Sequence, residues 1–139
     1  MTDITGQPIS DTRAWRPAEL AQTGWTTDLS AGEISDLHVM ADALPSDDAS
    51  WLAFDVRGII TPAVEALLHR ARDELATVRG FVLFRGLDAS DIERLRRVFW
   101  IIGNGLGEPV MQNARGEVLS LVADRFAGAE RGVDTRGYE

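Results

Sequence analysis

The sequence predicts an α+β domain in which N-terminal helices pack against a few strands. Three stretches of the 139-residue chain carry apolar residues at helical spacing, each preceded by a capping signal. A run of four β-forming apolar residues, Phe81 to Phe84, stands between Gly80 and Gly86 and predicts a buried strand. We therefore expect one domain over residues 15–139, preceded by a loose polar lead-in over residues 1–14.

The stretch after the lead-in carries three large apolar side chains, Trp15, Leu20 and Trp25, interrupted by Pro17 and Gly24. Proline and glycine disfavour regular structure, so an irregular segment is expected. Its tryptophans are predicted to anchor it to the rest of the domain.

The first predicted helix runs from Ala31 to Leu44. Ser30 and Glu33 form a capping box at its start, and Pro45 closes it. Residues 51–56, Trp-Leu-Ala-Phe-Asp-Val, are a weaker strand candidate.

The second predicted helix begins with Thr61 as N-cap and Pro62 in the first helical position, and Gly80 ends it. The third is predicted to start at a capping box of Ser90 and Glu93. Its expected buried face consists of Ile92, Leu95, Val98, Phe99 and Ile102.

The end of the third helix is predicted from glycines. Gly103, Gly105 and Gly107 should break it, and Pro109 should prevent its return. On its outer face, Glu93 and Arg97 are spaced to form an ion pair. Residues 118–122 form a second strand candidate. Two strands with buried faces leave unpaired strand edges, which folded proteins normally cover or pair. The sequence therefore predicts the N-terminal part of a larger protein with a more extensive sheet.

Composition excludes several classes of protein. The net charge of −8 disfavours a generic nucleic-acid binder. No apolar run approaches the ~20 residues of a membrane span, and the polar N-terminus is unlike a secretory signal. Cysteine is absent, which excludes disulfides and cysteine-ligated metals. We expect a cytoplasmic protein that binds neither nucleic acid nor membrane.

The only two histidines are His38 and His69. His38 lies on the apolar side of the first predicted helix and is expected at the edge of the core. His69 lies between acidic residues one turn away on either side and is expected in a solvated charge ladder. A His69/Asp73 metal pair is geometrically possible, but no third ligand is evident.

Other motifs also favour structural roles. The glycines at 103, 105 and 107 follow a helix, whereas a phosphate-binding loop precedes one. The pair Asp47–Asp48 reads as a solvated loop. The arginines at 94, 96 and 97 are interleaved with acidic residues, which is typical of a solvated helix face. The residues alone therefore show no complete active site and no metal site.

Several strings in the second half resemble a known family when taken in order. They are Arg79–Leu87, then Gly103–Gly116 after the third helix, then Val118–Asp124, and finally Arg136-Gly137-Tyr138. Together they resemble the N-terminal portion of the TauD/TfdA-like (taurine dioxygenase-like) family. Residues 60–138 carry most of the similarity, and residues 15–45 carry it loosely.

This resemblance implies a double-stranded β-helix, or jelly roll, of which the chain supplies the N-terminal helices and the opening strands. It also implies Fe(II) and 2-oxoglutarate as cofactors of the full-length enzyme. In the family a His-x-Asp motif follows the Arg-Gly-Tyr stretch, so residues 15–139 would be truncated before the metal-binding motif. No catalytic residue or metal ligand can be carried over. Gln112, Asn113 and Arg136 are the candidate substrate-binding residues, with loop hydrogen bonds and a surface salt bridge as the alternative reading.

Two functions are consistent with these observations. The first is the N-terminal segment of an oxidoreductase that hydroxylates a small organic substrate, inactive by itself. The second is a non-catalytic interaction module or remnant, whose open sheet edge pairs with a second copy or with a chain that carries the missing half.

Overall fold

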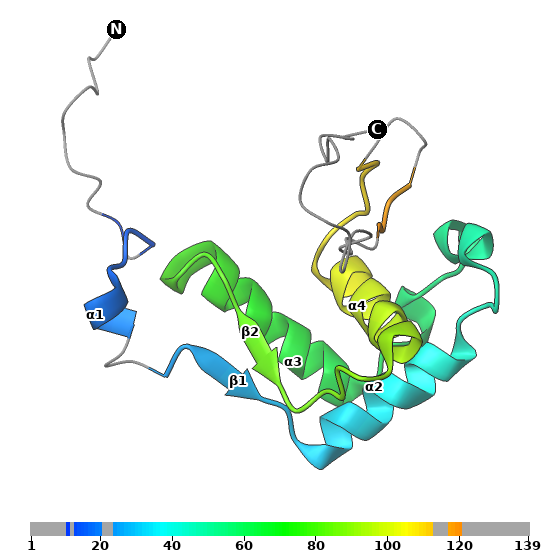
Figure 1. Ribbon diagram of the computed structural model, residues 1–139, viewed down its shortest axis with the longest axis horizontal. Coiled ribbons are helices and arrows are strands. Elements are labelled where there is room, and N and C mark those ends of the chain that lie inside the picture. The colour runs from blue at the N-terminus through cyan, green and yellow to red at the C-terminus, as the bar shows by residue number, and fades with distance from the viewer. Residues whose placement is uncertain (1–10, 12, 21–23, 113–116, 121–139) are drawn as a thin grey trace, which may run out of the picture. The chain divides into compact units, whose positions relative to one another are not determined.

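The computed structural model describes residues 11, 13–20, 24–112 and 117–120. The chain divides into two units, residues 1–109 and 110–139. All helices and strands of the described residues belong to the first unit (Figure 1). They are α1 Pro17–Leu20, β1 Thr26–Asp28, α2 Ala31–Ala43, η1 Asp48–Ala53, η2 Arg57–Ile59, α3 Pro62–Asp73, η3 Glu74–Val78, β2 Leu83–Arg85 and α4 Ile92–Leu106.

This mixture of helices and strands confirms the predicted α+β class. None of the helices in the described part of the chain is long and apolar enough to cross a membrane. Most of the predicted lead-in, residues 1–10 and 12, lies outside the described residues.

The two strands form a parallel pair, with Thr27 beside Phe84 in the register. The Leu29 N–H donates to the Arg85 carbonyl at 2.9 Å and prolongs the pairing by one residue. The predicted strand is therefore present but shifted, and it is not buried as expected, since Leu83 is 42% exposed. Among the described residues each strand has only the other as a partner.

Local capping explains where α2 and α3 begin, as predicted. The Ser30 hydroxyl accepts from the Glu33 N–H at 3.2 Å, and the Glu33 carboxylate accepts from the Ser30 N–H at 2.8 Å. Thr61 caps α3, and Pro62 takes its first position. The helix continues through η3, a π-helical turn, and the chain then turns at Gly80, whose φ of +80° favours glycine.

The strand predicted over residues 51–56 is wrong, because residues 51–53 belong to the 3₁₀ helix η1 and residues 54–56 are not in a strand. Asp47 caps η1 by accepting from the Ser50 N–H at 3.0 Å. Trp51 is only 3% exposed, and its indole N–H donates to the Pro45 carbonyl at 2.9 Å. A short helical turn can bury this one large ring against the helices, whereas a strand here would need a partner to satisfy its backbone.

The start and the end of α4 also differ from the prediction. Asp91 caps the helix, and Ser90 instead donates to Asp88 at 2.7 Å. The helix runs through Gly103 and Gly105 and ends at Gly107. Gly105 packs so closely on Leu68 of α3 that any side chain at this position would collide with it. This contact with another helix explains a glycine inside α4.

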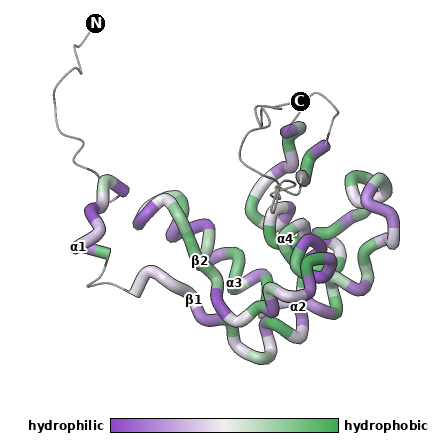
Figure 2. Tube along the Cα trace, in the orientation of Figure 1, coloured by the Kyte–Doolittle hydropathy of each residue, from purple (hydrophilic) through white to green (hydrophobic). Residues whose placement is uncertain are grey.

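The core lies where α2, α3 and α4 pack on one another, and apolar residues recur along all three helices (Figures 1 and 2). Its fully buried side chains are Leu37, Val64, Leu67, Leu68, Val98 and Ile101. The predicted buried face of α4 is right for Val98 and Ile102. It is wrong for Ile92 and Phe99, which are exposed, because the helix turns Trp100 and Ile101 inward instead.

The predicted Glu93–Arg97 pair does not form. Glu93 pairs with Arg96, with 3.1 Å between the carboxylate and the guanidinium. Arg97 instead donates to the carbonyls of Ala41 and Leu44, both at 3.1 Å. Both carbonyls lie at the end of α2, where the last helical carbonyls lack partners four residues on, and the Ala41 carbonyl also accepts from the Leu44 N–H at 3.3 Å. Arg97 therefore caps the C-terminus of α2.

The segment before β1 is anchored by aromatic side chains, as predicted. Trp15 and Trp25 both meet the ring of Phe81 edge-on, with centroids 5.2 and 6.1 Å away. The Trp15 indole N–H also donates to the Arg79 carbonyl at 3.2 Å. In the second unit, residues 118–120 are not in a strand, and the rest of the candidate strand 118–122 lies outside the described residues.

Candidate functional site

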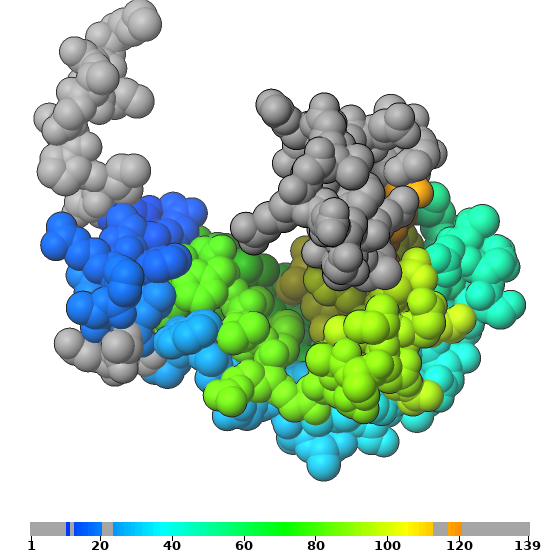
Figure 3. Space-filling view, in the orientation of Figure 1, coloured from blue at the N-terminus to red at the C-terminus, as the bar shows by residue number. Residues whose placement is uncertain are grey.

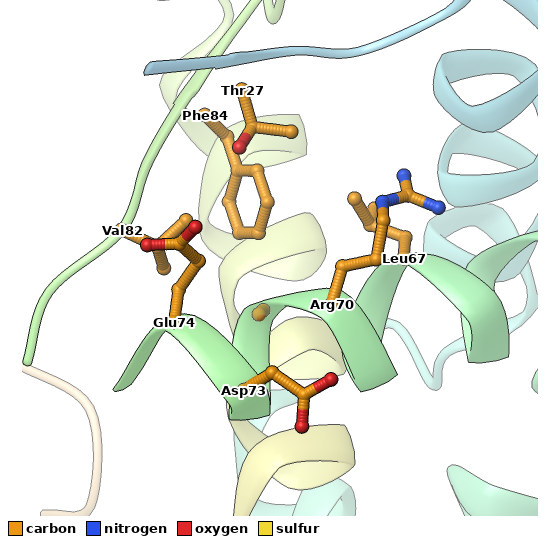
Figure 4. A pocket seen from close by; sticks show the side chains of 8 residues that line it. Thr27, Leu67, Arg70, Asp73, Glu74, Val82 and Phe84 are labelled. Atoms are coloured by element: carbon orange, nitrogen blue, oxygen red, sulfur yellow. The ribbon is translucent and has the colours of Figure 1, made fainter. Parts of the chain in front are cut away.

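One hollow among the described residues lies between the strand pair and α3. It has a volume of about 280 Å³. Figure 4 shows the side chains of Thr27 and Phe84 extending from the strands toward the helix, and Glu74 and Val82 also line the hollow. Leu67 and Ala71 of α3 also line it. The hollow exists because short strands and η3 leave the sheet incompletely packed on the helix.

The charged groups around this hollow are all engaged with neighbours. Arg70 donates to Glu33 of α2 at 2.7 Å. Glu74 accepts from Arg79 at 2.5 Å, and Asp73, which points away from the strands in Figure 4, lies 3.2 Å from His69. A charged ligand in this hollow would therefore have to displace an existing partner in order to bind any of these charged side chains.

Glu33 links the capping box to this site. Its pKa is lowered, first by the hydrogen bond from the Ser30 N–H and then by those from Arg70 and the Ser30 hydroxyl. Each of these donors favours the ionised carboxylate. Glu33 is therefore held as an anion that orients Arg70 beside the hollow.

The hollow can accept a small and largely apolar molecule, but its described lining offers little chemistry. Thr27 supplies a hydroxyl, and no histidine lines it. A nucleophile needs a neighbouring base, and a general acid needs a perturbed pKa aimed at the substrate. Neither arrangement is present in the part of the lining that the structure describes.

A second hollow of about 270 Å³ lies at the C-terminal end of α4. It is lined by Arg57, Ile60, Glu65, Arg72, Gly105 and Leu106. Arg72 donates to the Gly105 carbonyl and lies 3.2 Å from Glu65. Its guanidinium thus caps α4, which is a structural role.

The candidate substrate-binding residues lie in the second unit. Gln112 is exposed, and its side-chain amide donates to the Val110 carbonyl at 3.0 Å. Its backbone N–H donates to the Glu117 carbonyl at 2.7 Å. Asn113 and Arg136 lie outside the described residues. The structure therefore shows Gln112 in local loop hydrogen bonds and does not bring the three candidates together.

The two histidines lie on different helices. His38 is half-buried on α2, and His69 is exposed on α3, with its Nδ1 3.2 Å from an Asp73 carboxylate oxygen. Of the predicted charge ladder, the contact with Asp73 is present, whereas Glu65 pairs with Arg72. An Fe(II) centre of the implied family needs two histidines and a carboxylate on one face of the metal. No group of three histidine or acidic side chains within the described ranges could hold a metal ion. The described residues therefore do not fit the iron.

Sequence reasoning missed one cluster around Trp51. The guanidinium groups of Arg96 and Arg97 lie 5.8 and 5.5 Å from the centre of the Trp51 ring, and Trp100 packs beside it. The Arg96 Nε and Trp100 Nε1 atoms are buried without a conventional acceptor. The Trp51 ring presents an electron-rich face to the Arg96 guanidinium.

The prediction of a solvated arginine face is therefore wrong for Arg96 and Arg97, which are part of the packing, whereas Arg94 makes only exposed pairs. The aspartate at 48 likewise pairs with Arg96 rather than standing free in a loop. The Asp47-to-Ser50 capping spacing was the one local signal that could have revealed the turn carrying Trp51.

A comparison of the chain with models of known protein families finds no match, and a comparison with curated proteins finds none either.

Proposed function

We propose that the chain is the N-terminal segment of a TauD/TfdA-like Fe(II)- and 2-oxoglutarate-dependent dioxygenase. The enzyme would hydroxylate a small organic substrate in the cytoplasm. The observation that carries the proposal is the string Arg79–Leu87. It contains a strand, β2, flanked by two glycines with positive φ, Gly80 and Gly86. The strands of a jelly roll are antiparallel, so the parallel pair of β1 and β2 would be an addition to it, and the proposal rests on the sequence string rather than on this pairing.

The catalytic centre of such an enzyme would be completed by residues other than those described here. The whole sequence contains two histidines, and neither is the first residue of a His-x-Asp motif, because Val-Met follows His38 and Arg-Ala follows His69. Its own contribution would be scaffold: the helical core supports β1 and β2, on which further strands could add. We expect no stoichiometric iron and no turnover of 2-oxoglutarate by these 139 residues alone.

The proposal is tested by extending the chain. The coding sequence beyond the codon for Glu139 is read first, and a following His-x-Asp string is the expected result. The extended and the original chains are then purified, and iron content and succinate formed from 2-oxoglutarate are measured for both. Iron and succinate only in the extended chain support the proposal. An unrelated continuation without a ligand motif, or one-to-one iron with succinate in the original chain, contradicts it.

A second candidate function is a non-catalytic interaction module, and one observation favours it. Among the described residues, β1 and β2 pair only with each other, so each has a free outer edge. An extended segment of another chain could add to such an edge through backbone hydrogen bonds. An isolated chain that is monomeric and unfolds cooperatively would count against this function.

A further inference from the structure

The hollow between the strand pair and α3 is lined by apolar groups on both sides. Leu67 and Ala71, one turn apart on α3, form its helix side. Val82 and Phe84, on the strand side, add an aliphatic side chain and an aromatic ring. A molecule that fills this space removes apolar surface from water on both sides, which favours binding.

Thr27 places one hydroxyl group in this apolar surrounding. The register sets Thr27 directly opposite Phe84, so both side chains lie on the same face of the strand pair. Figure 4 shows that this face is turned toward α3. The Thr27 hydroxyl has no hydrogen-bond partner among the described residues. Since a hydroxyl can both donate and accept, it is available to a polar group of a bound molecule.

The charged side chains of the lining favour an uncharged ligand. Arg70 and Glu74 are held in ion pairs, and Asp73 lies 3.2 Å from His69. A charged ligand would have to displace one of these partners, whereas an uncharged ligand leaves them in place. The ligand is therefore expected to use its apolar body and a single hydrogen bond.

The size of the hollow is sufficient for one ring. Its volume is about 280 Å³, and an apolar cavity of about 150 Å³ can bind benzene. Figure 3 shows the strand pair at the surface of the first unit, with β1 in blue beside β2 in green, so a ligand has a short path from solvent. Glu74, which begins the π-helical turn η3, also lines the hollow. Such turns are rare and occur frequently at functional sites.

We propose that this hollow binds a small uncharged aromatic molecule with one hydroxyl group, that is, a phenol. The ring packs on Phe84, which favours a planar ligand over a branched one. The ligand hydroxyl forms a hydrogen bond with the Thr27 hydroxyl. The site is separate from the iron chemistry of the proposed function and does not depend on the dioxygenase resemblance.

The test is a titration of the full ¹⁵N-labelled chain with phenol, followed by the chemical shifts of its amides. The amides of Thr27, Ala71 and Phe84 should shift together and saturate, with a dissociation constant on the order of 1 mM, as expected for so small a ligand. Toluene, in which a methyl group replaces the hydroxyl, and benzoate, which is charged, are the comparison probes. Benzoate should bind more weakly than phenol.

Thr27→Val keeps the shape of the side chain and removes its hydroxyl. It should raise the dissociation constant of phenol about two- to tenfold, the range for one hydrogen bond, without weakening toluene. Thr26→Val is the matched control, because the neighbouring residue of β1 points to the opposite face of the strand pair. It should leave both probes unchanged.

Ala71→Met extends a side chain into the hollow and should abolish binding of both probes. Ala66→Met, at an exposed position of the same helix, should not. The dispersion of the amide spectrum verifies that each variant is folded. If Ala71→Met does not fold, the two threonine variants decide the outcome.

Four results would overturn the proposal. The first is the absence of saturable shifts with phenol up to about 10 mM, or shifts that lie away from the hollow. The second is a loss of toluene affinity in Thr27→Val as large as that of phenol. The third is benzoate binding as tightly as phenol. The fourth is a shift of the same amides with protein concentration alone, which would mean that a second copy occupies the hollow.

Discussion

The helical core and the strand pair are built to different degrees of completeness. The core buries whole side chains from α2, α3 and α4, and Trp51 lies beneath two arginines at its edge. The strand pair consists of two three-residue strands above a hollow of about 280 Å³. Among the described residues, the helical core is therefore much more completely packed than the strand pair.

The difference indicates which part supplies stability. Packing a side chain on all sides stabilises a protein far more than contact on one side. Three residues in a two-stranded pair contribute little by themselves. We infer that the helices fold and hold the strands in place, and that substitutions will show this asymmetry.

The largest effect is expected from truncation in the core. Leu37→Ala removes a fully buried side chain of α2 and should lower the free energy of unfolding by about 2 to 5 kcal/mol. The matched change in the sheet, Leu83→Ala, should cost less than about 1 kcal/mol because that side chain is half-exposed. Urea denaturation of both variants measures the contrast. Equal losses would contradict the asymmetry.

The next effect separates two glycines of one helix. Gly105→Ala places a methyl group against Leu68, whereas Gly103→Ala places it in open space. Overpacking should make the first variant less stable than the second by about 1 to 3 kcal/mol. Thermal and urea unfolding, at concentrations where the chain is monomeric, would show the difference. Two variants of the same stability would mean that α3 and α4 do not pack this closely.

A smaller loss is expected where Arg97 caps α2. Arg97→Lys cannot reach several carbonyls at once and should cost about 1 to 2 kcal/mol. Arg94→Lys is the control, because Arg94 makes only exposed pairs, 3.5 Å from Asp42 and 3.4 Å from Asp91. It should cost about 0.5 kcal/mol or less. The role assigned to Arg97 fails if the two losses are alike in urea denaturation.

The smallest effect depends on pH. The pKa of Glu33 is lowered, so its ionised form stabilises the fold above the usual carboxyl pKa of about 4.3. This contribution is lost as the pH falls through the lowered folded-state pKa. Glu33→Gln should therefore be less stable than the wild type at pH 7, by about 1 kcal/mol or less, and the gap should close in acid. A difference in the free energy of unfolding that grows as the pH falls would contradict the claim that the ionised form of Glu33 stabilises the fold.

The parts of the fold that the sequence predicts are those with a local cause. Ser30 with Glu33, and Thr61 with Pro62, start helices through residues within one turn of each other, so the pattern is sufficient. Gly80 ends its helical segment by a positive φ that the residue itself permits.

The parts that the sequence mispredicts depend on distant residues. Trp51 is in a helical turn because Arg96, Arg97 and Trp100 surround its ring. Gly105 stays inside α4 because of Leu68, nearly forty residues away. Neither contact leaves a local pattern.

The candidate site is harder to predict for the same reason. The hollow brings Thr27 and Phe84 together with Glu74, from three separate elements. Periodicity shows which face of each element is apolar, but not that two short strands leave a space above α3. Gln112, Asn113 and Arg136 came from the family resemblance instead, and the described residues give only Gln112 a local environment.

Native-state hydrogen exchange tests most directly the central claim, that the helical core supplies the stability and holds the weaker strand pair in place. The Ile101 amide, inside α4, should exchange only by global unfolding. The Leu29 amide, bonded to Arg85 at the end of the strand pair, should exchange through a local opening of much lower free energy. Equal protection of the two amides, at the free energy of global unfolding, would contradict the account.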